Sequence, residues 1–213
     1  MLDVERVKAD SERTIHALGG EVLTTLPVIG VDELSLRLGD EVAARALVLN
    51  LLVQMSFGAP AEVAREWLVA NRLQGAVAPS ESAWFDGKGP AGAATRQRLR
   101  WCIEPLCAAV WAGSLLDELG PTRPVPDTLA SLLPGLRDME SPKAFLQGFR
   151  LRSLEALYPT LDLYYRANWF TQECQLTGRD PAPFNVGIVQ ARRELLEWAT
   201  HAGVGWDDVE MST

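Results

Sequence analysis

The residues of this sequence that are best suited to chemistry lie between positions 161 and 170. Asp162 and Arg166 are four residues apart there, which places an acid and a base on one face of a helix. Tyr165 and Trp169 share the same spacing and flank the pair. A buried pair of this kind either fixes how two helices pack or, beside a cleft, forms part of a binding site.

A second acid, Glu104, lies in an apolar segment that runs from Trp101 to Leu116. A carboxylate buried among apolar side chains needs a cation or hydrogen-bond donors. We therefore predict that Glu104 joins Asp162 and Arg166 in the helical core. One interpretation of this cluster is a structural ion-pair network. The other is a ligand-binding pocket made by Glu104, Asp162, Tyr165, Arg166 and Trp169.

Signals for catalysis or metal binding are weak elsewhere in the chain. His16 follows Glu12 by four residues and His201 follows Glu197 by four, so each pair could supply two metal ligands from one helix face. A di-iron helical bundle needs Glu-x-x-His spacing and further glutamates, which the sequence lacks. It also lacks a nucleophile elbow, a dinucleotide motif and a kinase motif. We predict no catalytic residue, no metal site and no cofactor, while the question of catalysis stays open.

The composition describes an acidic globular protein. The chain has 213 residues, 47% of them hydrophobic, and a net charge of −8. Nucleic acids and anionic membranes attract basic surfaces, so this charge argues against both as partners. No apolar run approaches the roughly 20 residues that cross a bilayer. Three cysteines without a metal or disulfide pattern are typical of reduced thiols, so we expect a soluble, cytoplasmic protein.

These candidate residues must be positioned by helices, because the hydrophobic pattern predicts an all-α fold. We expect one irregular helical bundle of about eight or nine helices over residues 1–213. Residues 1–30 would form a first helix and a connector, residues 40–202 the helical core, and residues 203–213 a tail packed on that core. Residues 21–30 fit either an extended connector or a short strand without an evident partner.

The central helix is predicted to begin at an Asp40 cap and to end near Phe57. It carries two amides, Asn50 and Gln54, whose spacing lets them bond to each other or recognise a ligand. Residues 91–119 form the longest predicted helical segment, with a bend or a fresh start at Pro105.

Two further helices are predicted towards the end of the chain. One begins at Ser141 and continues through Leu157, where Pro159 interrupts it. The last begins after an Asn185 cap and runs from residue 186 to residue 202. Trp206 and Val209 are expected to pin the tail to the core.

Four blocks of sequence stand out through their order and spacing between residues 26 and 213. They are Glu41–Asn50, Arg100–Leu106 followed by Trp111, Leu161–Trp169, and Trp198 followed by Trp206–Val209. This pattern resembles the bacterial family catalogued as domain of unknown function 4272. The resemblance implies a single, mostly helical domain and brings no established activity, cofactor or catalytic residue. Pro105 and Asn168 depart from the family's pattern, where a better helix former and a histidine are expected.

The sequence favours a non-enzymatic module that binds another protein. This expectation rests on the helical pattern, the acidic charge and the lack of catalytic motifs. The alternative is a small-molecule or cation-binding pocket, with or without hydrolytic activity, around Glu104, Asp162, Arg166 and Trp169. The sequence does not fix the oligomeric state.

Overall fold

The structure is a computed structural model that describes residues 2–90 and 92–211. Within these ranges it contains nine α-helices and no strand, which confirms the predicted all-α class. The α-helices are α1 (Val4–Ala17), α2 (Gly39–Ser56), α3 (Ala61–Ala70), α4 (Ser82–Phe85), α5 (Ala93–Trp101), α6 (Ile103–Ala112), α7 (Lys143–Gly148), α8 (Leu154–Thr177) and α9 (Val186–Thr200). Short 3-10 helices connect them: η1 (Val31–Glu33), η2 (Gln74–Ala76), η3 (Pro79–Glu81), η4 (Asp127–Leu132) and η5 (Trp206–Asp208).

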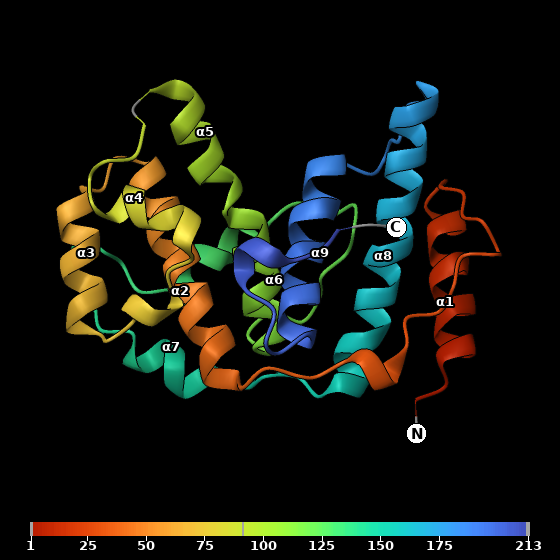
Figure 1. The fold of residues 1–213 in the computed structure, drawn as a ribbon, viewed down its shortest axis with the longest axis horizontal. Helices are drawn as coiled ribbons and strands as arrows, with labels where there is room; N and C mark the ends of the chain where they lie inside the picture. Colours follow the sequence, from red (N-terminus) through yellow and green to blue (C-terminus); the bar gives the residue numbers. More distant parts are fainter. Residues whose placement is uncertain (1, 91, 212–213) are drawn as a thin grey trace.

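The long helices stand side by side in an order that differs from the chain order. Helix α1 packs on α8, α8 on α9, α9 on α6, and α6 on α2. Helix α5 also contacts α2, and α3 contacts α2 from the side away from α6 (Figure 1). The first helix therefore lies at one end of the bundle and α3 at the other, and residues distant in sequence meet where α1 packs on α8, α9 on α6 and α6 on α2.

Helix α2 is central, as its all-round apolar pattern predicts. All eight residues from Ala46 to Val53 are buried. The predicted Asp40 cap is wrong, because the carboxylate of Glu41 instead accepts the Leu38 backbone N–H at 2.9 Å. The helix ends before Gly58, whose φ of +103° suits glycine.

The long helix predicted over residues 91–119 is two helices. Helix α5 ends at Trp101, and α6 begins at Ile103, so Pro105 occupies the first turn, where its missing N–H costs nothing. Helix α6 then ends at Ala112. The next residue, Gly113, lies against the ring of Phe149. A side chain at position 113 would collide with that ring.

The predicted break at Pro159 is also wrong. Helix α8 passes through Pro159, while the interruption comes earlier, at residues 149–153. In that stretch the backbone N–H groups of Arg150 and Arg152 donate to the last carbonyls of α6, those of Gly113 at 2.9 Å and Ala112 at 2.8 Å. These hydrogen bonds satisfy the two backbone N–H groups, which lie outside any helix.

Residues 21–30 form an irregular connector and no strand. Extended pairing occurs slightly later, where Ser35 forms a parallel bridge with His201. The Ser35 N–H donates to the Thr200 carbonyl at 2.8 Å, and the Ala202 N–H donates to the Ser35 carbonyl at 2.8 Å. Trp206 and Val209 of the tail pack against the core. None of the helices in the described ranges has the length and hydrophobicity needed to cross a membrane.

Candidate functional site

Asp162 and Arg166 form the predicted pair on α8, and both are fully buried. Arg166 donates from Nε and Nη2 to the two carboxylate oxygens of Asp162, each at 2.9 Å. Its Nη2 also donates to the Pro27 carbonyl at 3.0 Å. The pair therefore attaches the connector after α1 to the middle of α8.

A third charge completes this cluster from helix α1. The Oε1 atom of Glu12 lies 3.6 Å from Nη1 of Arg166. Neither atom has a hydrogen-bond partner among the described residues, so the contact is an ion pair with poor hydrogen-bond geometry. The cluster holds α1, the connector and α8 together.

The predicted pairing of Glu104 with Arg166 is wrong, because Glu104 pairs with Arg192 of α9. Arg192 donates from Nε to Oε2 of Glu104 at 2.8 Å, and its Nη2 lies 2.7 Å from the same oxygen. Its Nη1 donates to the Gly120 carbonyl at 2.9 Å. Helix α9 lies between α6 and α8, so an arginine of α9 reaches Glu104 first.

The five residues predicted to form a pocket are therefore divided between two ion-pair networks. The guanidinium of Arg166 lies 5.8 Å from the ring centre of Tyr165, and Trp169 is half-buried against the core. Asp162 and Arg166 have no exposed surface. Ligand binding by this set stays a prediction.

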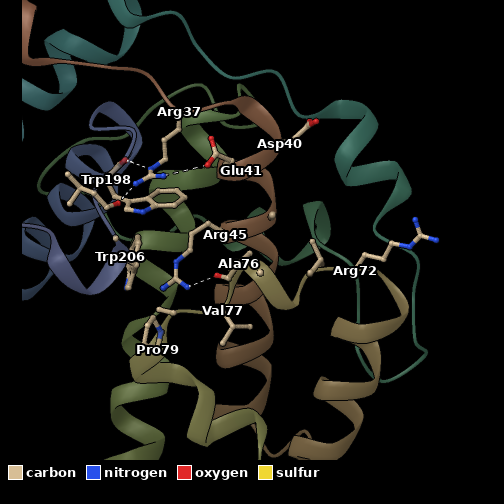
Figure 2. Close-up of a pocket in the computed structure, with 16 residues that line it drawn as sticks. Arg37, Asp40, Glu41, Arg45, Arg72, Ala76, Val77, Pro79, Trp198 and Trp206 are labelled. Carbon is tan, nitrogen blue, oxygen red and sulfur yellow. Dashed lines mark hydrogen bonds and ion pairs between the residues drawn. The ribbon is translucent and has the colours of Figure 1, made fainter.

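An open cavity lies elsewhere, over the start of α2. It has a volume of about 510 Å³ and is bordered by residues 72–73 and 75–79, the end of α9 and the tail. We name it the Arg–Trp pocket after Arg37, Arg45, Trp198 and Trp206, which line it (Figure 2). Its volume lies within the range of about 300–1,000 Å³ that is usual for ligand sites.

The four residues of the Arg–Trp pocket form a continuous stack. The guanidinium of Arg37 lies 4.1 Å from the ring centre of Trp198, and that of Arg45 lies 3.8 Å from the ring centre of Trp206. The two indoles meet edge to face at 5.7 Å. Cation–π contacts of this kind hold the tail against the start of α2.

Arg45 is 1% exposed and is held by Glu81 from η3. Its Nη1 and Nη2 each donate to one carboxylate oxygen of Glu81, both at 2.6 Å. The Nη1 also reaches the Ala76 carbonyl at 3.3 Å. The Nε–H has no hydrogen-bond acceptor among the described residues. A buried donor without an acceptor costs about 1–3 kcal/mol.

Arg37 caps the C-terminal end of α9. It donates from Nε to the Trp198 carbonyl at 2.7 Å, and from Nη2 to the carbonyls of His201 and Val204. Burial lowers the pKa of Arg37, and Glu41 at 3.6 Å acts in the opposite direction. A cation is favourable at this end of a helix because the carbonyl dipoles point towards it.

A group of acids lies behind the Arg–Trp pocket. Burial raises the pKa of Glu194, Arg45 lowers it, and the nearby carboxylates of Glu81 and Asp207 raise it further. Asp207 accepts the Ser80 N–H at 2.9 Å and the Ser80 hydroxyl at 2.6 Å. The tail is therefore attached to η3 by hydrogen bonds as well as by Trp206.

The sequence interpretation missed the Arg–Trp pocket, because its walls come from four separated segments. One signal was present: Arg45 lies in the first block of the family resemblance, and Trp198 and Trp206 lie in the fourth. The structure brings these two blocks together.

Thiol and metal chemistry are not evident in the structure. Burial raises the pKa of Cys102 to about 12 and that of Cys107 to about 11, so both thiols stay protonated at neutral pH. Residues 2–90 and 92–211 contain no group of three or more His, Cys, Asp or Glu side chains arranged to hold a metal ion.

The fold and the pocket define a single-domain, all-α protein with an arginine- and tryptophan-lined cavity on its surface. A family model described as "Domain of unknown function (DUF4272)" matches residues 7–209. The chain therefore belongs to this family, which confirms the resemblance seen in the four sequence blocks. No curated protein and no solved structure matches the chain.

Proposed function

We propose that this protein is a non-catalytic module that binds a segment of a partner protein in the Arg–Trp pocket. The observation that carries the proposal is the buried Nε–H of Arg45. This donor has no hydrogen-bond acceptor among the described residues, and Arg45 itself lines the pocket. An occupant that supplies an oxygen to this donor removes the cost of leaving it unpaired.

The charges favour a neutral acceptor such as a peptide carbonyl. Glu81 already balances Arg45, and Glu41 lies 3.6 Å from Arg37. The side chains of Asp40 and Arg72 point away from the two indoles in Figure 2. With little net charge left, a second carboxylate would be repelled by Glu81, whereas a backbone carbonyl would not.

The aromatic walls suit the side chains of such a segment. Trp198 and Trp206 are amphipathic and hold their positions through two arginine contacts. Tryptophan and arginine are enriched among the residues that dominate protein interfaces. An apolar side chain of the partner would cover the indole surface, while its main chain approaches Arg45.

A matched pair of variants tests this function. Gly75 lines the pocket, and a Cβ there would meet no heavy atom within 4 Å, so we expect the indole of Gly75→Trp to occupy the cavity. The neighbouring Gln74 is exposed and does not line the pocket, which makes Gln74→Trp the control. Peptides are selected from a random display library on the wild-type protein, and their affinities for all three proteins are measured by calorimetry.

The expected result is that Gly75→Trp weakens the selected peptides at least about tenfold, which is 1.4 kcal/mol, while Gln74→Trp leaves them unchanged. Two results would overturn the proposal. One is a library that yields no peptide tighter than about 100 µM. The other is a set of peptides that lose equal affinity in both variants.

The alternative function, a small-molecule or cation site around Glu104, Asp162, Arg166 and Trp169, has one supporting observation. Nη1 of Arg166 lacks a hydrogen-bond partner among the described residues. Against a cation, both carboxylate oxygens of Asp162 already accept from Arg166. A ligand would have to open the contact between α1 and α8, so peptide binding at the Arg–Trp pocket is preferred.

The cytoplasmic location and the lack of nucleic-acid partners belong to the same proposal. The three cysteines are free thiols, and two of them are buried, which is typical of a reducing compartment. The net charge of −8 disfavours contact with phosphate backbones.

A further inference from the structure

A second cavity opens on the other half of α2. Its volume is also about 510 Å³, and it lies between α2, the start of α6 and residues 125–135. We name it the apolar pocket, because most of its walls are apolar side chains; they include Val53, Phe57, Ile103, Leu106 and Leu133. It shares no lining residue with the Arg–Trp pocket.

Two amides lie in the wall of the apolar pocket, and both hold the turn at Pro134. Gln54 donates from Nε2 to the Pro134 carbonyl at 3.1 Å and accepts the Leu136 N–H at 2.7 Å. Asn50 donates from Nδ2 to the same carbonyl at 3.0 Å. The predicted hydrogen bond between Asn50 and Gln54 is therefore wrong, because both side chains donate to the Pro134 carbonyl instead.

This arrangement leaves the two amides unequal. Gln54 uses both its carbonyl oxygen and its nitrogen. Asn50 uses only its nitrogen, and its Oδ1 accepts no hydrogen bond from any described residue. Asn50 is 6% exposed and lines the apolar pocket, so this acceptor borders a mostly hydrophobic cavity. A polar atom in such a place is satisfied only by water or by a ligand.

We propose that the apolar pocket binds a small apolar molecule that carries one N–H or O–H donor, with Asn50 Oδ1 as the acceptor. The volume accommodates a bicyclic ring or a group of similar size. Apolar walls with a small number of polar groups are the usual composition of a small-molecule site, and the polar side chains that line this one are Asn50, Gln54 and Asp127. Phe57 is 69% exposed at the rim, with Arg100 lying 4.8 Å from its ring centre, and offers a further aromatic surface to the ligand.

The test compares two probes that differ at the ring nitrogen. 5-Fluoroindole carries an N–H, and 5-fluoro-1-methylindole has a methyl group in its place, so the second cannot donate to Asn50. Fluorine NMR titration of the 213-residue protein measures both affinities. We expect the methylated probe to bind at least about fivefold more weakly, because it would cover Asn50 Oδ1 without donating a hydrogen bond to it.

A pair of variants locates the site. Ala130 is exposed and lines the pocket, so Ala130→Trp should block its mouth and abolish binding of 5-fluoroindole. Ala156 is exposed on α8 and does not line the pocket, so Ala156→Trp should leave binding unchanged. Gly75→Trp should also leave it unchanged, which separates this site from the Arg–Trp pocket.

Three results would overturn the inference. Absence of binding for both probes would remove the site. Equal affinities would remove the role of Asn50. Binding that survives Ala130→Trp would place the probe elsewhere. None of these outcomes depends on whether peptides bind the Arg–Trp pocket.

Discussion

Arg45 and Glu81 are 36 positions apart in the sequence and form a bidentate ion pair. Nη1 and Nη2 of Arg45 each lie 2.6 Å from one carboxylate oxygen of Glu81. The pair joins α2 to η3 in the interior, where the Arg45 side chain is 1% exposed and that of Glu81 is 10% exposed. Glu81 also accepts the Ala78 N–H at 3.0 Å, which shapes the segment that borders the Arg–Trp pocket. The pair therefore supports both the fold and the pocket.

Glu81→Gln should destabilise the protein strongly. The change leaves the buried charge of Arg45 without its counterion, and such losses cost about 3–5 kcal/mol. Urea unfolding at pH 7 measures the effect. Glu62→Gln, at an exposed position of α3, is the control and should change stability by less than about 0.5 kcal/mol. A loss below about 1 kcal/mol for Glu81→Gln would contradict a buried pair.

The two acids around Arg166 should contribute unequally. Asp162 makes two hydrogen bonds with Arg166, whereas Glu12 makes only a 3.6 Å ion pair with it. We expect Asp162→Asn to lower the free energy of unfolding by about 3–5 kcal/mol and Glu12→Gln by about 1 kcal/mol. Guanidinium denaturation gives both values. Equal losses would show that the geometry does not set the strength of these contacts.

The partner of Glu104 is open to a direct energetic test. A double-mutant cycle combines Glu104→Gln with Arg192→Met, and a second cycle combines Glu104→Gln with Arg166→Met. The first should give a coupling energy above about 1 kcal/mol, because these side chains are bonded. The second should give less than about 0.5 kcal/mol, as expected for residues without a shared contact. A larger coupling energy in the second cycle than in the first would support the pairing of Glu104 with Arg166 that the sequence predicted.

The sequence identified the helices whose ends carry clear local signals. Helix α9 begins where Asn185 suggested, with Asn185 Oδ1 accepting the Ile188 N–H at 3.2 Å. Helix α1 lies within residues 1–30, where a first helix and a connector were predicted, and Gly19, which has a φ of +87°, follows its end. The bend or fresh start predicted at Pro105 occurs three residues earlier, at Cys102, because proline is tolerated in the first turn of the new helix.

The site was harder to predict because its contacts connect distant segments. Asp162 and Arg166 lie in one helix, so their spacing alone revealed the pair. Arg192 lies 88 positions from Glu104, and local spacing gives no sign of which arginine will meet it. The Arg–Trp pocket presents the same difficulty, because Arg37 and Trp198 meet only after α9 has packed beside α6. Such pairs depend on the order of helices in space.

The buried thiols predict how stability should change in alkaline solution. Burial raises the pKa of Cys102 to about 12 and that of Cys107 to about 11, from an ordinary value of 9.0. The unfolded chain therefore loses these protons first as the pH rises. The stabilisation is complete below pH 9 and declines above it, by about 1 kcal/mol for each thiol between pH 8 and pH 10.

Urea unfolding of the wild type and of Cys107→Ala at both pH values measures this decline. The variant is expected to be less stable at pH 8, because it loses buried volume, and to lose about 1 kcal/mol less than the wild type on the change to pH 10. Burial also raises the pKa of Tyr158 and of Tyr164 to about 12 from a value of 10.0, so their ionisation in the unfolded chain begins to lower stability near pH 10. Both proteins contain these tyrosines, so the difference between the two declines reports the Cys107 thiol. An equal decline in both proteins would show that the Cys107 thiol titrates alike in the folded and unfolded chains.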